Sequence, residues 1–398
     1  MKIITLLGDG MSDVRYEELG NRSPLEAACT PNMDFMARHG YAGMARTVPK
    51  GLPPGSDVAN LSIFGYDPRE CYTGRSPLEA ISMGVVLGSD DVAFRMNLVT
   101  LKPGGSKICM QDFSAGHIST DEGKVLVEML QRELGTSEFE FYPGVGYRHL
   151  MVWRGGKETM KSTPPHDITG KSILDSLPSG EGSEILINIM NHAQLALHKH
   201  PVNLEREKEG KLPANSIWLW GHGKTPAMPA YREKFGLEGA VISAVDLIKG
   251  IGICAGLDII NVEGATGYID TNYSGKAMAA LTALETHDFV YLHVEAPDEA
   301  SHSGRMDHKI RAIEDFDREV VGRIMRGISE FRDYAILCTP DHPTPVHLMT
   351  HTSEPVPFVI YRGGEKPGNG AASYSEEEAG KTGVLVDGCR LMNIMIKN

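Results

Sequence analysis

Three short apolar runs in this sequence lead into polar residues, in the form of buried parallel strands. The runs and the carboxylates that follow them are residues 3–7 with Asp9, residues 288–294 with Asp298, and residues 334–338 with Asp341. Open α/β sheets place their sites at the carboxyl ends of such strands. We therefore predict a candidate site that draws on both ends of the chain.

Helical spacing of apolar residues occupies stretches between these runs, for example residues 278–284 and 309–324. The pentapeptide Ser-Pro-Leu-Glu-Ala occurs at residues 23–27 and again at 76–80. Each copy has serine at the N-cap, proline at the first helical position and glutamate at the third, which predicts two similar helix starts. The alternation of strands and helices predicts an α/β core with a mainly parallel sheet flanked by helices.

The middle of the chain has a different pattern. Strand-like segments such as residues 92–99 are followed by amphipathic helices, and the charged stretch 205–211 closes the region. We predict that residues 93–216 form a smaller α+β domain. It would be inserted into a discontinuous core made of residues 1–92 and 217–398.

The composition of the chain indicates which classes of partner are not expected. The 39 basic and 52 acidic residues give a formal net charge of −13, which repels phosphate backbones, so we expect no nucleic-acid partner. No apolar run approaches the roughly 20 residues of a membrane span, so we expect no membrane partner. The six cysteines are scattered singly, which is typical of a reducing compartment and predicts a cytoplasmic protein. The sequence contains no pattern that indicates an oligomeric state.

The carboxylates at the strand ends are accompanied by histidines. Asp298 and His302 are four residues apart and share one face of a helical turn, Asp341 adjoins His342, and His351 follows nine residues later. Taken alone, each motif is more often an N-cap or a surface hydrogen bond. Their joint placement after strand-like runs favours a ligand set for two Zn²⁺ or Mn²⁺ ions.

A serine on a glycine turn is the second candidate for chemistry. Ser56 lies within the stretch 51–62, directly before a helical pattern, where the first N–H groups of a helix can bind phosphate oxygens. Its alternative role is that of an N-cap, with Asp57 in the first turn. If a divalent ion coordinates the hydroxyl, Ser56 becomes a nucleophile near neutral pH.

Taken together, four motifs resemble the cofactor-independent phosphoglycerate mutases of the archaeal type, within the alkaline phosphatase superfamily. They lie at residues 8–11, at 55–62 with 65–68, at 296–302, and at 341–345 with 351–352. The resemblance covers nearly the whole chain. It implies an alkaline-phosphatase-like core with residues 93–216 as a substrate-binding cap. It also implies interconversion of 3-phosphoglycerate and 2-phosphoglycerate through a phosphoserine.

The resemblance also implies a role for each candidate residue. Ser56 would be the nucleophile. One metal would be held by Asp298, His302 and His351, and a second, which also contacts Ser56, by Asp9, Asp341 and His342. The expected ions are manganese first, with zinc or magnesium as alternatives. Two such ions roughly 4 Å apart can stabilise the entering and leaving oxygens of a phosphoryl transfer.

The predicted cap departs from the family pattern. Family members tend to have an arginine-rich stretch where residues 111–118 contain no arginine. We therefore expect a small phosphorylated substrate to be bound by other residues of the cap. The candidates are His166, Asp167, Arg148 and His149, with Arg95 as a weaker one.

This departure keeps an alternative open, because a subgroup similar to these mutases has been proposed to act as homoserine kinases. The alternative is a homoserine kinase-like phosphotransferase or a phosphatase on the same core. The sequence contains no complete Walker-type phosphate loop, which favours the mutase. A metal-stabilised binding protein without catalysis is a third hypothesis.

Overall fold

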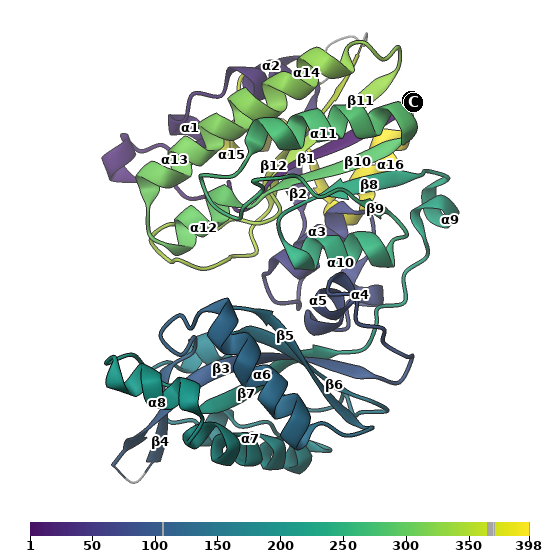
Figure 1. Cartoon of the computed structure of the whole chain (residues 1–398). Helices are drawn as coiled ribbons and strands as arrows, with labels where there is room; N and C mark the ends of the chain where they lie inside the picture. The colour runs from purple at the N-terminus through teal and green to yellow at the C-terminus, as the bar shows by residue number, and fades with distance from the viewer. Residues whose placement is uncertain (106, 364–368, 370, 398) are drawn as a thin grey trace. The chain divides into compact units, whose positions relative to one another are not determined.

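The computed structural model describes residues 1–105, 107–363, 369 and 371–397. The chain divides into two compact units, which are each described separately (Figure 1). Unit 1 contains residues 1–72 and 227–398, and unit 2 contains residues 73–226. The sequence predicts an insertion at 93–216, and the assignment of that segment as a substrate-binding cap stays a prediction.

Unit 1 is built on an eight-stranded sheet with the order β13-β2-β12-β11-β1-β10-β8-β9. Among the strand pairs of the described residues, only β11–β12 and β12–β2 are antiparallel, which confirms the mainly parallel sheet. The strands are β1 (Lys2–Gly8), β2 (Tyr41–Arg46), β8 (Gly239–Ile242), β9 (Asp258–Ile259), β10 (Phe289–Val294), β11 (Tyr334–Thr339), β12 (Val356–Arg362) and β13 (Leu385–Asp387).

The three strands predicted from the sequence are neighbours at the centre of this sheet. Leu7 of β1 lies opposite His293 of β10 and opposite Thr339 of β11. The backbone N–H of Asp9 then donates to the Val294 carbonyl at 2.9 Å. Because the three carboxyl ends are aligned, the residues that follow them meet at one edge of the sheet.

Helices cover both faces of the sheet, and Figure 1 shows α11 and α14 on one side and α3 and α10 on the other. The predicted helix at 309–324 is a run of three segments, α13 (Met306–Asp315), the π-helix η4 (Phe316–Val321) and α14 (Gly322–Ile328). The other helices of unit 1 are α1 (Pro24–Ala27), α2 (Pro31–His39), α3 (Ser56–Ile63), α4 (Pro68–Cys71), α9 (Tyr231–Phe235), α10 (Asp246–Cys254), α11 (Tyr273–Thr286), α12 (Ala296–His302), α15 (Glu376–Lys381) and α16 (Leu391–Ile396), with short 3₁₀ turns at η1 (Glu17–Leu19) and η5 (Gly388–Arg390).

Apolar packing holds these layers together. Buried residues from β1, β10 and β11 form one cluster with α2, α11, α13, η4 and α14. On the opposite face, the rings of Phe64 and Tyr291 stack with centroids 3.9 Å apart, and Tyr231 stacks on Phe289 at 4.9 Å. The central strands are therefore buried on both faces, as their continuous apolar runs predict.

Unit 2 is an antiparallel five-stranded sheet with the order β4-β3-β6-β5, in which β7 also pairs with β3. Helix α6 packs on β5 and α7 packs on β7, around their own buried cluster, which confirms a smaller α+β unit. Its elements are β3 (Val92–Gly104), β4 (Lys107–Asp112), β5 (Phe139–Val145), β6 (Arg148–Trp153), β7 (Ser216–Gly223), α5 (Ser76–Ser82), α6 (Thr120–Leu134), α7 (Ser183–His198), α8 (Pro201–Lys208), η2 (Pro165–Ile168) and η3 (Leu174–Ser176).

The two copies of the pentapeptide begin helices in different ways. Ser23 caps α1 and forms a reciprocal capping box with Glu26, as predicted. The expectation that Ser76 is an N-cap is wrong, because Arg75 occupies that position and Ser76 is the first residue of α5. The Ser76 hydroxyl donates instead to the Gly221 carbonyl at 2.5 Å. Among the described residues, no helix is both long and apolar enough to cross a membrane.

Candidate active site

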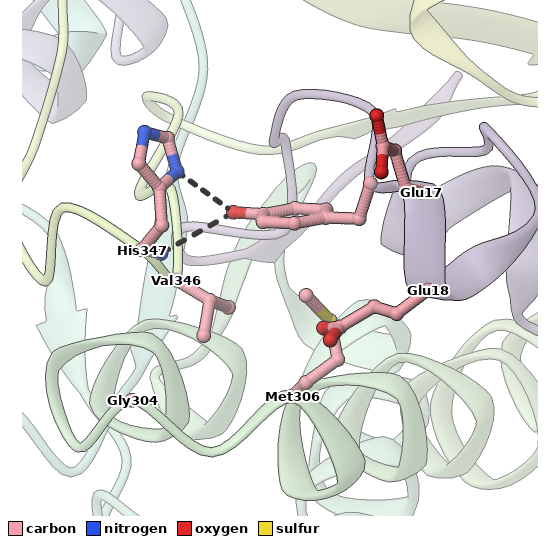
Figure 2. Close-up of a pocket in the computed structure, with 7 residues that line it drawn as sticks. Glu17, Glu18, Gly304, Met306, Val346 and His347 are labelled. Carbon is pink, nitrogen blue, oxygen red and sulfur yellow. Dashed lines mark hydrogen bonds between the residues drawn. The ribbon is translucent and has the colours of Figure 1, made fainter.

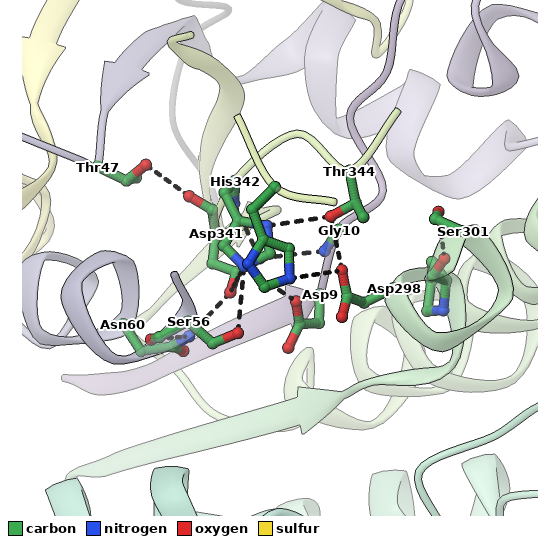
Figure 3. A network of polar contacts seen from close by, with 12 residues as sticks. Asp9, Gly10, Thr47, Ser56, Asn60, Asp298, Ser301, Asp341, His342 and Thr344 are labelled. Atoms are coloured by element: carbon green, nitrogen blue, oxygen red, sulfur yellow. Dashed lines mark hydrogen bonds and ion pairs between the residues drawn. The ribbon is translucent and has the colours of Figure 1, made fainter. Parts of the chain in front are cut away.

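The carboxyl ends of β1 and β11 bring Asp9, Asp341 and His342 together, and we call these three residues the inner group. Their ligand atoms all lie within 4.8 Å of one another. The Nε2 atom of His342 is 3.2 Å from Asp341 Oδ2 and 3.7 Å from Asp9 Oδ1. Figure 3 shows these side chains converging from segments that are far apart in the sequence.

The inner group is almost completely removed from solvent. Asp9 is 2% exposed, and Asp341 and His342 are 0% exposed. The backbone N–H groups of Gly10 and His342 donate to Asp341 Oδ1 at 3.1 and 2.8 Å. Gly10 has a φ of +61°, and a Cβ at this position would lie 2.5 Å from Asp298 Oδ1. A glycine is therefore needed where the loop after β1 passes the carboxylate.

Electrostatics prepare the inner group for a cation. Burial raises the pKa of Asp9 well above its usual value, and the neighbouring Asp341 and Asp298 raise it further. Burial lowers the pKa of His342 to about 4, so its imidazole is neutral near pH 7 and can act as a ligand. Asp9 Oδ1 is buried and has no hydrogen-bond partner among the described residues. Such an atom is costly to bury unless something binds it.

Ser56 is the first residue of α3 and faces the inner group. Gly55 occupies the N-cap position, so the alternative role of Ser56 as a capping residue is not realised. The Ser56 hydroxyl oxygen lies 3.1 Å from Nε2 of His342. Its location at the start of a helix favours an anion on this side chain.

Asn60 is a site residue that the sequence reasoning missed. Its Nδ2 donates to the Ser56 carbonyl at 2.8 Å and to Asp341 Oδ2 at 3.0 Å. Its Oδ1 accepts a hydrogen bond from the Tyr291 hydroxyl at 2.6 Å. The only signal in the sequence is that Asn60 lies one helical turn after Ser56, on the same face of α3.

Asp298, His302 and His351 form what we call the outer group. Helix α12 supplies Asp298 and His302 at the predicted spacing, and His351 comes from the segment between β11 and β12. Nε2 of His302 is 3.2 Å from Asp298 Oδ2, and Nε2 of His351 is 3.5 Å from Asp298 Oδ1. The two Nε2 atoms are themselves 2.8 Å apart. Asp298 and His351 also form a compact set with His342, whereas His302 belongs to neither set of three.

Charge is balanced within the outer group. Although burial raises the pKa of Asp298, hydrogen bonds from His302 and His351 hold it well below its usual value. Burial lowers the pKa of His302, but contact with Asp298 outweighs this effect and raises it to about 9. A cation must therefore displace a proton from this group.

Thr344 joins the two groups. Its hydroxyl donates to Asp298 Oδ1 at 2.6 Å and lies 3.1 Å from Nδ1 of His342 (Figure 3). The buried Lys309 ammonium donates to the Thr344 carbonyl at 2.9 Å and to Asp13 Oδ2 at 2.8 Å. This lysine ties the loop after β1 to the loop after β11.

A cavity of about 530 Å³ lies in unit 1 beside the segment that follows β1, and Figure 2 shows its lining. The Tyr16 hydroxyl is 3.1 Å from Nδ1 of His347 and accepts the backbone N–H of His347 at 3.3 Å. Glu17, Glu18 and Met306 complete much of the wall. Because this cavity includes none of the predicted site residues, it is distinct from the candidate active site.

The predicted substrate-binding residues of unit 2 have different environments. His149 is 2% exposed, its Nδ1 accepts the Gly144 N–H at 3.0 Å, and burial lowers its pKa to about 4. In contrast, His166, Asp167 and Arg148 are exposed. The ring of His166 packs edge-on against Trp220, with centroids 5.5 Å apart. His149 is therefore buried within unit 2, and the substrate roles of all four residues stay predictions.

Comparison with known sequences gives one consistent family. A family model described as 2,3-bisphosphoglycerate-independent phosphoglycerate mutase matches residues 37–203. A Geobacter sulfurreducens protein named "Probable 2,3-bisphosphoglycerate-independent phosphoglycerate mutase" is 66% identical over 397 residues, which cover 100% of both chains. A Methanosarcina barkeri protein named "2,3-bisphosphoglycerate-independent phosphoglycerate mutase" is 51% identical over 401 residues and again covers 100% of both chains.

Solved structures agree with these sequences. A Pyrococcus horikoshii protein matches with a TM-score of 0.84 and 32% identity over 99% of this chain and 96% of its own. The cofactor-independent phosphoglycerate mutase of Thermoplasma acidophilum matches with a TM-score of 0.67 and 28% identity over 100% of this chain and 99% of its own. The motifs, the full-length identity and the shared fold lead to one conclusion: this chain belongs to the archaeal-type family of 2,3-bisphosphoglycerate-independent phosphoglycerate mutases.

Proposed function

We propose that this chain interconverts 3-phosphoglycerate and 2-phosphoglycerate through a phosphoserine on Ser56. The observation that carries this proposal is the 3.1 Å approach of the Ser56 hydroxyl to Nε2 of His342. His342 belongs to both compact sets of carboxylate and imidazole side chains. A serine at a helix start beside two such sets is suited to phosphoryl transfer.

The proposal includes two divalent cations, held by the inner group with Ser56 and by the outer group. The unpartnered Oδ1 of Asp9 and the neutral imidazole of His342 fit a cation. Mixed carboxylate and imidazole donors favour manganese or zinc over magnesium, which prefers oxygen ligands, and we take manganese as the first candidate. When bound, such cations lower the pKa of a coordinated hydroxyl and neutralise charge on a transferring phosphoryl group.

The chain's own residues supply the nucleophile and its placement. Ser56 Oγ loses its proton and forms a bond to phosphorus while the bond from phosphorus to O3 of the substrate breaks and O3 gains a proton. O2 of the same glycerate then loses its proton and takes the phosphoryl group, which restores the Ser56 hydroxyl. Asn60 fixes Ser56 relative to Asp341 throughout, through its hydrogen bonds to both residues.

Substrate recognition completes the proposal. The substrate is a small phosphorylated anion, and the exposed Arg148, His166 and Asp167 supply charged or polar groups. We assign these three residues, the buried His149 and the segment 93–216 to substrate binding. A cytoplasmic location and the absence of nucleic-acid and membrane partners are part of the same proposal.

An enolase-coupled assay tests this function. Metal-free protein reconstituted with Mn²⁺ is given 3-phosphoglycerate in one arm, and homoserine with ATP in the other. We expect turnover in the first arm, and a phosphate on Ser56 detected by mass spectrometry. Ser56→Ala should lose both while keeping its melting temperature. Turnover only with homoserine and ATP would establish the kinase alternative, and full mutase activity in Ser56→Ala would exclude the phosphoserine.

A further inference from the structure

His293 is a fully buried histidine that none of the sequence motifs includes. It lies on β10, between β1 and β8, and is 0% exposed. Its Nε2 atom is 2.9 Å from Asp9 Oδ2, and its Nδ1 atom is 3.2 Å from the Ser243 hydroxyl oxygen. The ring is therefore held on both sides, with a member of the inner group on one of them.

The direction of the first hydrogen bond follows from the chemistry of its partner. An aspartate that binds a cation is ionised and its oxygens only accept, so with metal bound Nε2 of His293 would carry the proton and donate a hydrogen bond to Asp9 Oδ2. The Ser243 hydroxyl oxygen is itself fixed, because it accepts the Val245 backbone N–H at 2.9 Å. A chain of contacts thus runs from the loop after β8, through the His293 ring, to one oxygen of Asp9.

The two carboxylate oxygens of Asp9 have different environments. Oδ2 is bound by His293, whereas Oδ1 is buried, has no hydrogen-bond partner in the part of the chain that the structure describes, and lies 3.7 Å from Nε2 of His342. A buried carboxylate with a purely structural role usually has hydrogen bonds to both of its oxygens. Here one oxygen is anchored and the other faces the remaining inner-group side chains.

We propose that His293 is a positioning residue that anchors Asp9 Oδ2 and thereby presents Asp9 Oδ1 to a cation in the inner group. This inference rests on the proposed function, because it requires that the inner group binds a metal. Side chains that hold a metal ligand from behind typically alter metal affinity by about 10- to 100-fold when they are removed. In the more common arrangement a carboxylate orients a metal-bound histidine, and here the order is reversed.

Two substitutions separate the donor from the bulk of the ring. His293→Gln places an amide N–H the same number of bonds from Cα as Nε2, so it can keep the hydrogen bond to Asp9. His293→Phe keeps an aromatic ring of similar shape but has no donor. Ser243→Ala removes the contacts of the hydroxyl to Nδ1 and to the Val245 N–H, and it provides a milder variant that retains His293.

Calorimetric titration of each metal-free protein with Mn²⁺ alone is the test, together with its melting temperature before and after Mn²⁺ is added. We expect His293→Phe to bind the inner-group cation about 10- to 100-fold more weakly. His293→Gln should stay within a few-fold of the unmodified protein, and Ser243→Ala should fall between them. The loss of affinity should appear as a smaller Mn²⁺-induced rise in melting temperature.

Equal Mn²⁺ affinity in His293→Phe and the unmodified protein would overturn the inference, even if His293→Phe melts at a lower temperature without metal. Equal weakening in His293→Gln and His293→Phe would also overturn it, because the donor would then have no special role. If His293→Phe does not fold, the comparison of Ser243→Ala and His293→Gln with the unmodified protein decides. Failure of the unmodified protein to bind Mn²⁺ would instead refute the proposed function.

Discussion

The inner and outer groups use the same two kinds of side chain but are built by different parts of the fold. Asp9 and Asp341 follow adjacent strands whose register is fixed by backbone hydrogen bonds. His302 and His351 lie on a short helix and on a loop, and their side chains are 33% and 19% exposed. A sheet holds ligands rigidly, whereas a helix end and a loop can adjust. The inner group is therefore the preorganised half of the site.

The two groups also differ in charge. In the inner group, burial and then the neighbouring carboxylates raise the pKa of Asp9, and the imidazole of His342 is neutral near pH 7. The outer group pairs Asp298 with a protonated His302. We expect the inner group to gain more from a cation, because its two carboxylates share one neutral imidazole, whereas Asp298 of the outer group lies beside a protonated His302. The outer group would exchange a proton for a metal, so we expect its occupancy to depend more strongly on pH.

Asp341→Asn should have the largest effect. The amide keeps a similar shape, but the inner group loses a negative charge and a ligand. We expect kcat/KM in the enolase-coupled assay to fall by about 10³-fold, in line with several kcal/mol of lost charge stabilisation. Mn²⁺ titration should show only the outer site occupied at micromolar metal. A variant that retains both sites and full activity would contradict the role of the inner group.

Asp298→Asn is the matched change in the outer group. We expect a loss of about 10²-fold in kcat/KM, smaller than for Asp341→Asn, because the inner group and Ser56 stay intact. In this variant the inner site should still bind Mn²⁺. The comparison between rigid and adjustable halves fails if Asp298→Asn costs more activity than Asp341→Asn.

Thr344→Val tests whether the two groups are coupled. Valine has a similar shape but removes the hydroxyl that contacts both Asp298 and His342. We expect Mn²⁺ affinity to fall by about 10-fold at both sites, as for other residues behind metal ligands. Thr344→Ser keeps the hydroxyl and serves as the control. A change at one site alone would show that the groups act independently.

The smallest predicted effect is a pH dependence of the metal-free protein. The pKa of His302 is raised to about 9, so its contribution to stability is complete below pH 6.5 and is lost as pH rises through 9. The pKa of His342 is lowered to about 4, so stability is lost there as pH falls from 6.5 towards 4. We expect the melting temperature in EDTA to decline by a few degrees between pH 7 and pH 9.5.

His302→Gln is the control for this decline. This variant should have a lower melting temperature at pH 7, and its melting temperature should decline less between pH 7 and pH 9.5. The loss of stability below pH 6.5 that is associated with His342 should stay unchanged. If the melting temperature declines equally above pH 7 in His302→Gln and in the unmodified protein, the predicted charge difference between the two groups is wrong.

Sequence reasoning reached the carboxylate and imidazole side chains that meet in the site but not the residues behind them. Asp9 and Asp341 closely follow apolar runs, and the alignment of parallel strands predicts that they meet. His293 lies inside such a run, and its partner Asp9 is 284 positions away. Only the register of β1 and β10 brings the two together, so nothing local in the sequence indicates the pair.

The repeated pentapeptide shows the same limit for the fold. Both copies begin helices, because proline and glutamate favour a first turn wherever they occur. Ser23 caps its helix, whereas Ser76 is the first residue of its own and donates to Gly221, which is 145 positions away. Local sequence predicts that a helix exists, and distant contacts decide where it begins.

The order of strands in unit 1 has a consequence for how the chain folds during synthesis. Strand β1 is made first, yet its two neighbours in the sheet are β10 and β11, which begin at Phe289 and Tyr334. Unit 2 contains all of its own strands within residues 73–226. We expect unit 2 to complete its sheet on the ribosome before β10 and β11 have been synthesised and can pair with β1. The site then assembles last, because it needs the final third of the chain.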